Sequence, residues 1–180
     1  NKVFKQFDGK VLSANIYYKS GERYLEPSTI MTVDGIKVGL IGATTPLVEQ
    51  FEEESGNVKD MRFAMPADEI RKEVQNLKKQ GADVIVLLAH MGLPNENNIP
   101  GTGVVDIANE VSGIDVIIAG HEHKNVSKQV VNGTIITEPY RYGAAISVVD
   151  LKFNVDSKGK KTLVNKDAKT ISVNSKKSDK

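Results

Sequence analysis

The sequence contains no cysteine and only three histidines among its 180 residues. Without cysteine it can form no disulfide, thiolate nucleophile or cysteine zinc site. It has neither a signal peptide nor an apolar run near the roughly 20 residues of a membrane span. It begins at Asn1 rather than methionine, as expected if an upstream segment has been removed. The net charge of +1 argues against a nucleic-acid-binding protein, which usually has a strongly basic face. What remains is a globular chain about one domain long.

The order of the predicted elements favours an α/β fold. A helix is predicted over 66–80, between Pro66 and Gly81, and a shorter helix over 104–111. Continuous apolar runs predict buried strands over 11–16, 36–41, 83–88 and 115–119. Strands that alternate with helices in this way are typical of a sheet with crossover helices.

Two hairpins and a β-rich end are also predicted. Asp34-Gly35 and Asn132-Gly133 each stand between β-like runs, and both residues of such pairs tolerate positive φ. Residues 145–155 and 162–173 are further β-like stretches. The acidic stretch 49–55 is predicted to be a solvated loop, and the polar composition from about Lys166 predicts a linker or tail.

All three histidines follow predicted buried strands. His90 comes after the strand over 83–88, and His121 and His123 come after the strand over 115–119. Because ligands of open α/β sheets bind beyond the carboxyl ends of the strands, these side chains are expected at one functional edge. His121 and His123 would project to the same side of an extended backbone. Imidazole is a common metal ligand, so the placement predicts a metal site; the alternative for a lone histidine is a hydrogen-bonded structural role.

An ordered series of segments carries a resemblance to one family. The series consists of residues 11–15, 34–46, 82–92 with Ala89-His90-Met91-Gly92, and 113–123 ending in Gly120-His121-Glu122-His123. It resembles the 5'-nucleotidase and 2',3'-cyclic nucleotide phosphodiesterase branch of the calcineurin-like metallophosphoesterases, from about Val11 to Leu151. The Gly-His-x-His element alone is moderately specific, and the ordered series is much more so.

This resemblance implies a fold and a cofactor. The family fold is a four-layer α/β/β/α sandwich with two divalent metal ions at the edges of its sheets. By resemblance, His90 and His121 would bind the second metal ion and His123 the first. Two such ions can polarise a phosphoryl oxygen, generate a hydroxide and stabilise the leaving oxygen. The metal can be Mn, Zn, Fe, Co or Ni, because imidazole-rich sites accept all of them.

The sequence also departs from the family pattern. The earlier Asp-x-His, Gly-Asp and Gly-Asn-His-Glu motifs, which supply further ligands in the family, are absent. We therefore expect residues 1–156 to be the C-terminal half of a catalytic domain whose N-terminal half is missing. Residues 157–180 would form a final strand and a linker or tail toward a missing C-terminal domain. Three neutral imidazoles cannot balance two divalent cations, so we predict that the isolated chain is inactive and binds metal weakly.

Three further residues are candidates for contacts near the substrate or the ligands. Asn15 can hydrogen-bond near the site or cap the loop backbone. Glu122 can orient an imidazole or, in an extended segment, point away. Arg141, in a loop that matches the family, can steer an anionic substrate or lie on the surface. For each residue the second, structural role is favoured.

The resemblance implies a metal-dependent hydrolase of nucleotide phosphate esters, acting as a 5'-nucleotidase, a 2',3'-cyclic nucleotide phosphodiesterase or both. Its expected partners are a nucleotide or another small phosphate ester and the missing N-terminal half of its own domain. The resemblance also implies that the protein lies outside the cytoplasm, as an extracellular, periplasmic or cell-wall-associated protein. Two alternatives stay open: a phosphoesterase for a non-nucleotide substrate, and a degenerate, non-catalytic binding module on the same fold.

Overall fold

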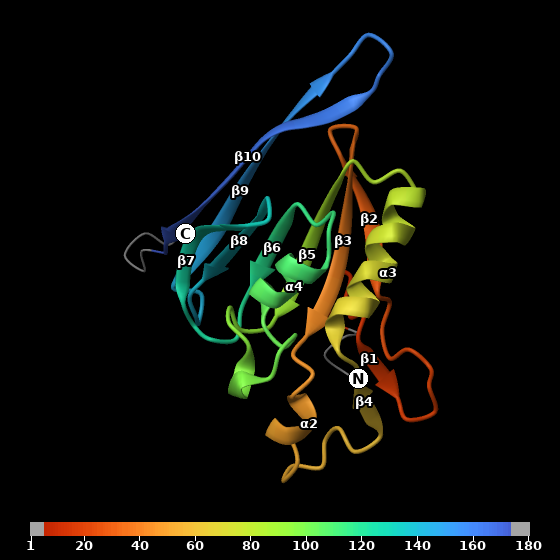
Figure 1. The fold of residues 1–180 in the computed structure, drawn as a ribbon, viewed down its shortest axis with the longest axis vertical. Coiled ribbons are helices and arrows are strands. Elements are labelled where there is room, and N and C mark those ends of the chain that lie inside the picture. The colour runs from red at the N-terminus through yellow and green to blue at the C-terminus, as the bar shows by residue number, and fades with distance from the viewer. Residues whose placement is uncertain (1–5, 174–180) are drawn as a thin grey trace.

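A six-stranded sheet forms the centre of the computed structural model, which describes residues 6–173 (Figure 1). The sheet has the strand order β2-β3-β5-β6-β8-β7. Its strands are β2 (Ser28–Val33), β3 (Ile36–Thr44), β5 (Val84–His90), β6 (Val116–Ala119), β7 (Asn125–Val131) and β8 (Thr134–Pro139). The four central strands are parallel, whereas β2 and β7 run antiparallel to their hairpin partners at the two edges. The predicted α/β class and both predicted hairpins are confirmed.

Two helices cover one face of this sheet (Figure 1). They are α3 (Pro66–Lys79) and α4 (Val104–Glu110), both close to their predicted ranges. Ile70, Val74 and Leu77 lie on one side of α3 at helical spacing, and all are buried in the main apolar cluster. Leu87 of β5 belongs to the same cluster and is fully buried. The apolar core therefore lies between the helices and the sheet.

A long hairpin packs against β7 and β8, at one edge of the sheet, and extends beyond the sheet (Figure 1). It consists of β9 (Ala145–Val155) and β10 (Lys161–Ser172). Side-chain contacts attach it to the sheet, including Thr137 Oγ1 to Ser147 Oγ at 2.8 Å and Lys161 Nζ to Asp83 Oδ2 at 3.1 Å. On the face opposite the helices, Leu88 of β5 is still 39% exposed, so this face is only partly covered.

Short elements gather near the carboxyl end of β3 (Figure 1). They are β1 (Ile16–Tyr18), α2 (Val48–Phe51), β4 (Met61–Phe63) and the 3-10 turn η1 (Glu96–Asn98). The strands β1 and β4 form an antiparallel pair of their own. These elements border the edge at which the histidines lie. Among the described residues, no helix is both long and apolar enough to cross a membrane.

The predicted strand over 11–16 is wrong. The chain forms one isolated bridge, Leu12 with Glu26, and β1 begins only at Ile16. Ser13 and Ala14 donate their backbone N–H groups to two different segments, to Glu26 O and Gly42 O, so no continuous ladder forms. The chain passes so close to Gly42 that a Cβ there would lie 2.1 Å from the Leu12 carbonyl oxygen. The apolar run thus reflects burial rather than strand pairing.

Two other predictions about the chain need correction. The acidic stretch 49–55 is not wholly a loop, because its first residues belong to α2. The β-like stretch predicted over 162–173 is confirmed as β10, so the linker predicted from about Lys166 begins no earlier than the end of that strand at Ser172. The buried Ala168 and the bond from Lys166 Nζ to Asp115 O, at 2.9 Å, hold this polar strand in place. The predicted tail beyond it, over 174–180, lies outside the described residues.

Candidate functional site

The sheet brings His90 and His121 together at its carboxyl edge. His90 ends β5, beside Thr44 at the end of β3, and His121 follows the neighbouring strand β6. The ring centroids of the two histidines are 5.2 Å apart, edge to face. Phe51 of α2 stacks on the His121 ring, with the two ring centroids 5.7 Å apart. The predicted meeting of two strand-end imidazoles is therefore present in the structure.

His123 takes a different direction from its neighbour. The backbone φ is 95° at His121 and 57° at His123, so this segment turns instead of staying extended. The expectation that both side chains project to one side of an extended strand is therefore wrong. The His123 ring contacts Tyr142, with centroids 5.4 Å apart. Left-handed backbone at a non-glycine residue is uncommon and costs energy, and here it occurs at both histidines.

The environment of His90 favours the neutral imidazole that a metal ion requires. Surrounding loops remove part of its hydration, although the residue remains open to solvent at the sheet edge. This desolvation lowers the pKa of His90, and the nearby His121 lowers the pKa further. The lowered pKa favours the neutral form of His90, which keeps a lone pair that could bind a metal ion.

The residues present fit one side of a metal centre rather than a complete one. His90 and His121 supply two adjacent imidazoles, whereas the His123 ring contacts Tyr142. Between residues 6 and 173, no three His, Asp or Glu side chains lie close enough together to hold an ion. A centre built on these imidazoles therefore needs further ligands.

Glu96 is a site residue that the sequence did not reveal. It lies in η1, after β5, and its carboxylate Oε1 is 3.4 Å from His121 Nε2. The sequence around Glu96 predicts an asparagine-rich loop. Nothing in this pattern distinguishes Glu96 from the glutamates that are predicted to be exposed to solvent. Only the return of the loop toward β3 places this carboxylate beside the histidines.

Glu122 supports a loop rather than a histidine ring. Its Oε2 atom accepts a hydrogen bond from Leu93 N at 2.8 Å and lies 3.1 Å from Lys124 Nζ. A Cβ on Gly92 would meet the Glu122 side chain at 2.9 Å, which shows how tightly the two are packed. Glu122 therefore fixes the loop that follows His90, a role that neither of its two predicted alternatives described.

Asn15 caps loop backbone, the role favoured from the sequence. It is fully buried, accepts from Thr44 N at 3.0 Å, and donates through Nδ2 to Thr44 O and Ala64 O. With these bonds it ties the end of β3 to the segment after β4. Asn15 thus holds Thr44, the residue paired with His90 in the sheet, in place.

Arg141 is exposed and lies in an aromatic loop beside His123. Its guanidinium carbon lies 5.4 Å from the centre of the Tyr140 ring and 5.1 Å from that of Tyr142. Both tyrosines have positive φ, 67° and 56°, and Tyr142 is 86% exposed. This strained loop presents two aromatic rings and one cation next to a candidate ligand.

A buried acid lies beneath the histidine loop. Glu138 of β8 is fully buried, and its Oε1 accepts from Lys124 N at 3.1 Å. Its other carboxylate oxygen is buried without a hydrogen-bond partner among the described residues. Burial raises the pKa of Glu138, and the neighbouring Glu122 adds to this effect. No local pattern around Glu138 indicates that this glutamate is buried.

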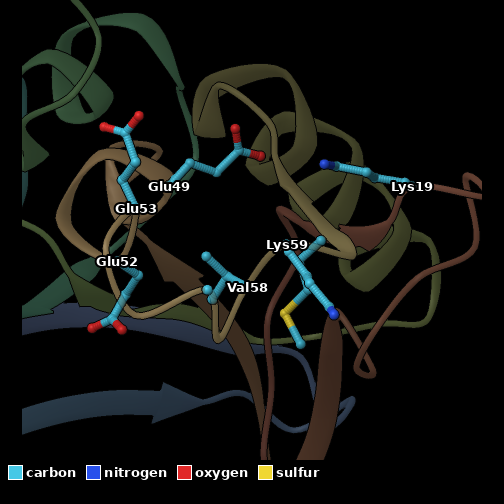
Figure 2. A pocket seen from close by; sticks show the side chains of 8 residues that line it. Lys19, Glu49, Glu52, Glu53, Val58 and Lys59 are labelled. Atoms are coloured by element: carbon cyan, nitrogen blue, oxygen red, sulfur yellow. The ribbon is translucent and has the colours of Figure 1, made fainter.

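An open hollow between α2 and the segment before β4 does not include the histidines. Its lining combines acidic and basic side chains, among them Glu49, Glu52, Lys19 and Lys59. In Figure 2 the carboxylate of Glu49 and the ammonium of Lys19 point toward one another across it. Ser55 and Asn57 donate hydrogen bonds to Glu52 and lower its pKa. Because none of the three histidines lines this hollow, it is not the candidate site.

Comparison with known proteins identifies the family. The family model described as bacterial capsule synthesis protein PGA_cap matches residues 17–147. The Bacillus subtilis endonuclease YhcR is 35% identical over 93% of this chain, and the 5'-nucleotidase of Vibrio cholerae is 29% identical over 79%. The crystal structure of the calcineurin-like phosphoesterase YfkN from Bacillus subtilis superposes with a TM-score of 0.79, at 25% identity, over 92% of this chain and 56% of that one.

The chain belongs to the PGA_cap family and to the 5'-nucleotidase branch of the calcineurin-like phosphoesterases. It spans only part of its relatives, 14% of YhcR and 30% of the Vibrio 5'-nucleotidase. Another relative, at 30% identity over 79% of this chain and 20% of its own length, is the cell wall protein Lmo0130 of Listeria monocytogenes. The predicted resemblance to this branch and the predicted α/β fold are confirmed.

Proposed function

We propose that this chain supplies histidine ligands to a two-metal phosphoesterase that hydrolyses nucleotide phosphate esters. The observation that carries this proposal is the pairing of His90 and His121 at the carboxyl edge of the sheet, with their ring centroids 5.2 Å apart. This is the edge at which α/β sheets bind their ligands. The relatives with nucleotidase and phosphoesterase names support the same substrate class.

In this proposal His90 and His121 hold one metal ion and His123 helps to hold the other. The metal pair would polarise the phosphoryl group and lower the pKa of a bound water. The lowered pKa of His90 supports its role, because only a neutral imidazole can coordinate. Glu122 keeps the loop after His90 in place through Leu93 N. Arg141, on its exposed aromatic loop, would attract the anionic substrate toward His123.

The same proposal includes a second half of the domain. The partly uncovered sheet face, where Leu88 is 39% exposed, is suited to packing against another sheet. That second half would bring the carboxylates that three imidazoles require for charge balance. On this reading residues 1–156 complete a catalytic domain, 157–180 lead to a further domain, and the isolated chain has no activity. The relationship to a Listeria cell wall protein supports a location outside the cytoplasm.

The test is phosphate release by the longer protein that contains this chain. It would be supplied with Mn²⁺ and either 5'-AMP or 2',3'-cyclic AMP, the cyclic substrate being coupled to an added phosphatase. We expect hydrolysis that is lost in His121→Ala and retained in Lys152→Ala, an exposed position on the β9–β10 hairpin. The ratio of the two rates would name the activity. A folded, metal-loaded protein that released phosphate from neither nucleotide would contradict the proposal.

A further inference from the structure

The 3-10 turn after β5 fixes one carboxylate beside His121. Glu96 Oε1 lies 3.4 Å from His121 Nε2, and the Glu96 side chain is only 9% exposed. This distance is slightly longer than the usual N–H···O hydrogen bond of about 2.7–3.2 Å. The two atoms are thus close neighbours without a hydrogen bond between them in this structure. A nearly buried carboxylate next to an imidazole is costly unless it is hydrogen-bonded, so its partners decide what it does.

The Glu96 carboxylate is held from several directions. Its Oε2 accepts from the hydroxyl of the buried Thr45 at 3.0 Å, and its Oε1 accepts from Gly92 N at 3.4 Å. The Glu96 backbone N–H donates to the hydroxyl of the fully buried Thr102 at 2.7 Å. These bonds join the turn to the ends of β3 and β5.

The turn that carries Glu96 is also strained. The two residues that follow, Asn97 and Asn98, have φ values of 51° and 58°. Such conformations persist only where the surrounding structure over-determines them, and they concentrate at functional sites. The strained turn therefore suggests a functional role for Glu96, the residue that it carries.

The His121 ring is confined on its other sides. Phe51 stacks on it, with an interplanar angle of 26°, and His90 meets it edge to face. With Glu96 Oε1 near Nε2, three side chains contact the ring. These contacts restrain the orientation of the ring.

We infer that Glu96 is a positioning residue that selects the His121 tautomer with the proton on Nε2, leaving the Nδ1 lone pair for a metal ion. The inference rests on the proposed function in naming the metal, but the tautomer is a property of this chain alone. A carboxylate that accepts the N–H of one ring nitrogen fixes which nitrogen is free to coordinate. Both Glu96 oxygens already accept hydrogen bonds from Thr45 and Gly92, which favours positioning over direct coordination.

The first test is the tautomer of His121 in the metal-free 180-residue chain. Long-range ¹H–¹⁵N NMR distinguishes the two imidazole tautomers, and the three histidines can be assigned by the loss of one signal in His121→Gln. We expect the Nε2–H form in the wild type and in Glu96→Gln, whose amide oxygen can still accept the proton. We expect a mixture in Glu96→Ala. An Nδ1–H form in the wild type, or no change in Glu96→Ala, would overturn the inference.

The second test is metal affinity in the longer protein, measured by calorimetric titration with Mn²⁺. Loss of an orienting carboxylate typically weakens metal binding about 10- to 100-fold. We expect this loss in Glu96→Ala, a smaller one in Glu96→Gln, and none in the control Glu54→Ala, an exposed glutamate of the neighbouring loop. Equal losses in Glu96→Ala and Glu96→Gln would show that the charge itself is required and would reject positioning.

The two proposals can fail separately. If the Glu96 variants alter the tautomer and the affinity as expected but no nucleotide is hydrolysed, the proposed function fails and the positioning role stands. If nucleotides are hydrolysed and Glu96→Ala changes neither the tautomer nor the affinity, the positioning role fails alone.

Discussion

The helix-covered core and the histidine edge of the same sheet are built in opposite ways. The core under α3 and α4 consists of buried apolar side chains, and none of its residues has a left-handed backbone. The edge, a few residues farther along the same strands, combines positive φ at His121, His123, Tyr140 and Tyr142 with exposed aromatic rings. This comparison shows how the apolar core can stabilise a strained histidine edge. The free energy gained by packing the core offsets the cost of the left-handed backbone at the edge.

The largest expected effect comes from weakening the core. Leu87→Ala would remove a fully buried side chain and should lower the free energy of unfolding by about 2–5 kcal/mol, through lost burial and the cavity left behind. Urea denaturation followed by circular dichroism would measure it. The adjacent Leu88→Ala is the matched control, since Leu88 points to the other face and is 39% exposed; its cost should be less than half as large. Equal costs would mean that the two faces are equally covered.

A smaller effect is expected where the core meets the edge. Asn15→Ala would leave Thr44 N, Thr44 O and Ala64 O without their side-chain partner. Unsatisfied buried groups of this kind cost about 1–3 kcal/mol. Thermal unfolding would measure the loss, with Asn109→Ala, whose hydrogen bond to Asn132 is exposed, as the control. If Asn15→Ala were as mild as Asn109→Ala, the network at Thr44 would not support the edge.

The smallest expected effect has the opposite sign, because it relieves strain at the edge. Tyr142 has φ of 56° and an 86% exposed side chain. Tyr142→Gly should raise the free energy of unfolding by up to about 1 kcal/mol, since glycine adopts this conformation without the Cβ clash. Tyr142→Ala removes the ring but keeps the strain, so it should not stabilise. If the two variants unfold at the same temperature, the loop is not strained at this position.

Local sequence signals predicted most of the secondary structure. Asp34-Gly35 and Asn132-Gly133 formed the expected hairpins, and the apolar spacing of α3 matched its buried side. These features depend on a residue's own φ preference or on side-chain periodicity, both of which are written in neighbouring residues. The run over 11–16 misled because buried irregular chain can be as apolar as a strand. The polar composition from Lys166 suggested a linker inside the predicted β-like stretch 162–173, because one side of a paired hairpin strand faces solvent.

The sequence by itself determined which strands end in histidine and therefore which edge of the sheet carries His90, His121 and His123. Only the tertiary structure decided that His121 turns toward His90 while His123 turns toward Tyr142, because their φ values depend on how the loop packs. It also decided that Glu96, six residues beyond His90 in the chain, returns to contact His121. Strand ends follow from local pattern, whereas contacts between loops arise from packing and hydrogen bonds among segments far apart in the sequence.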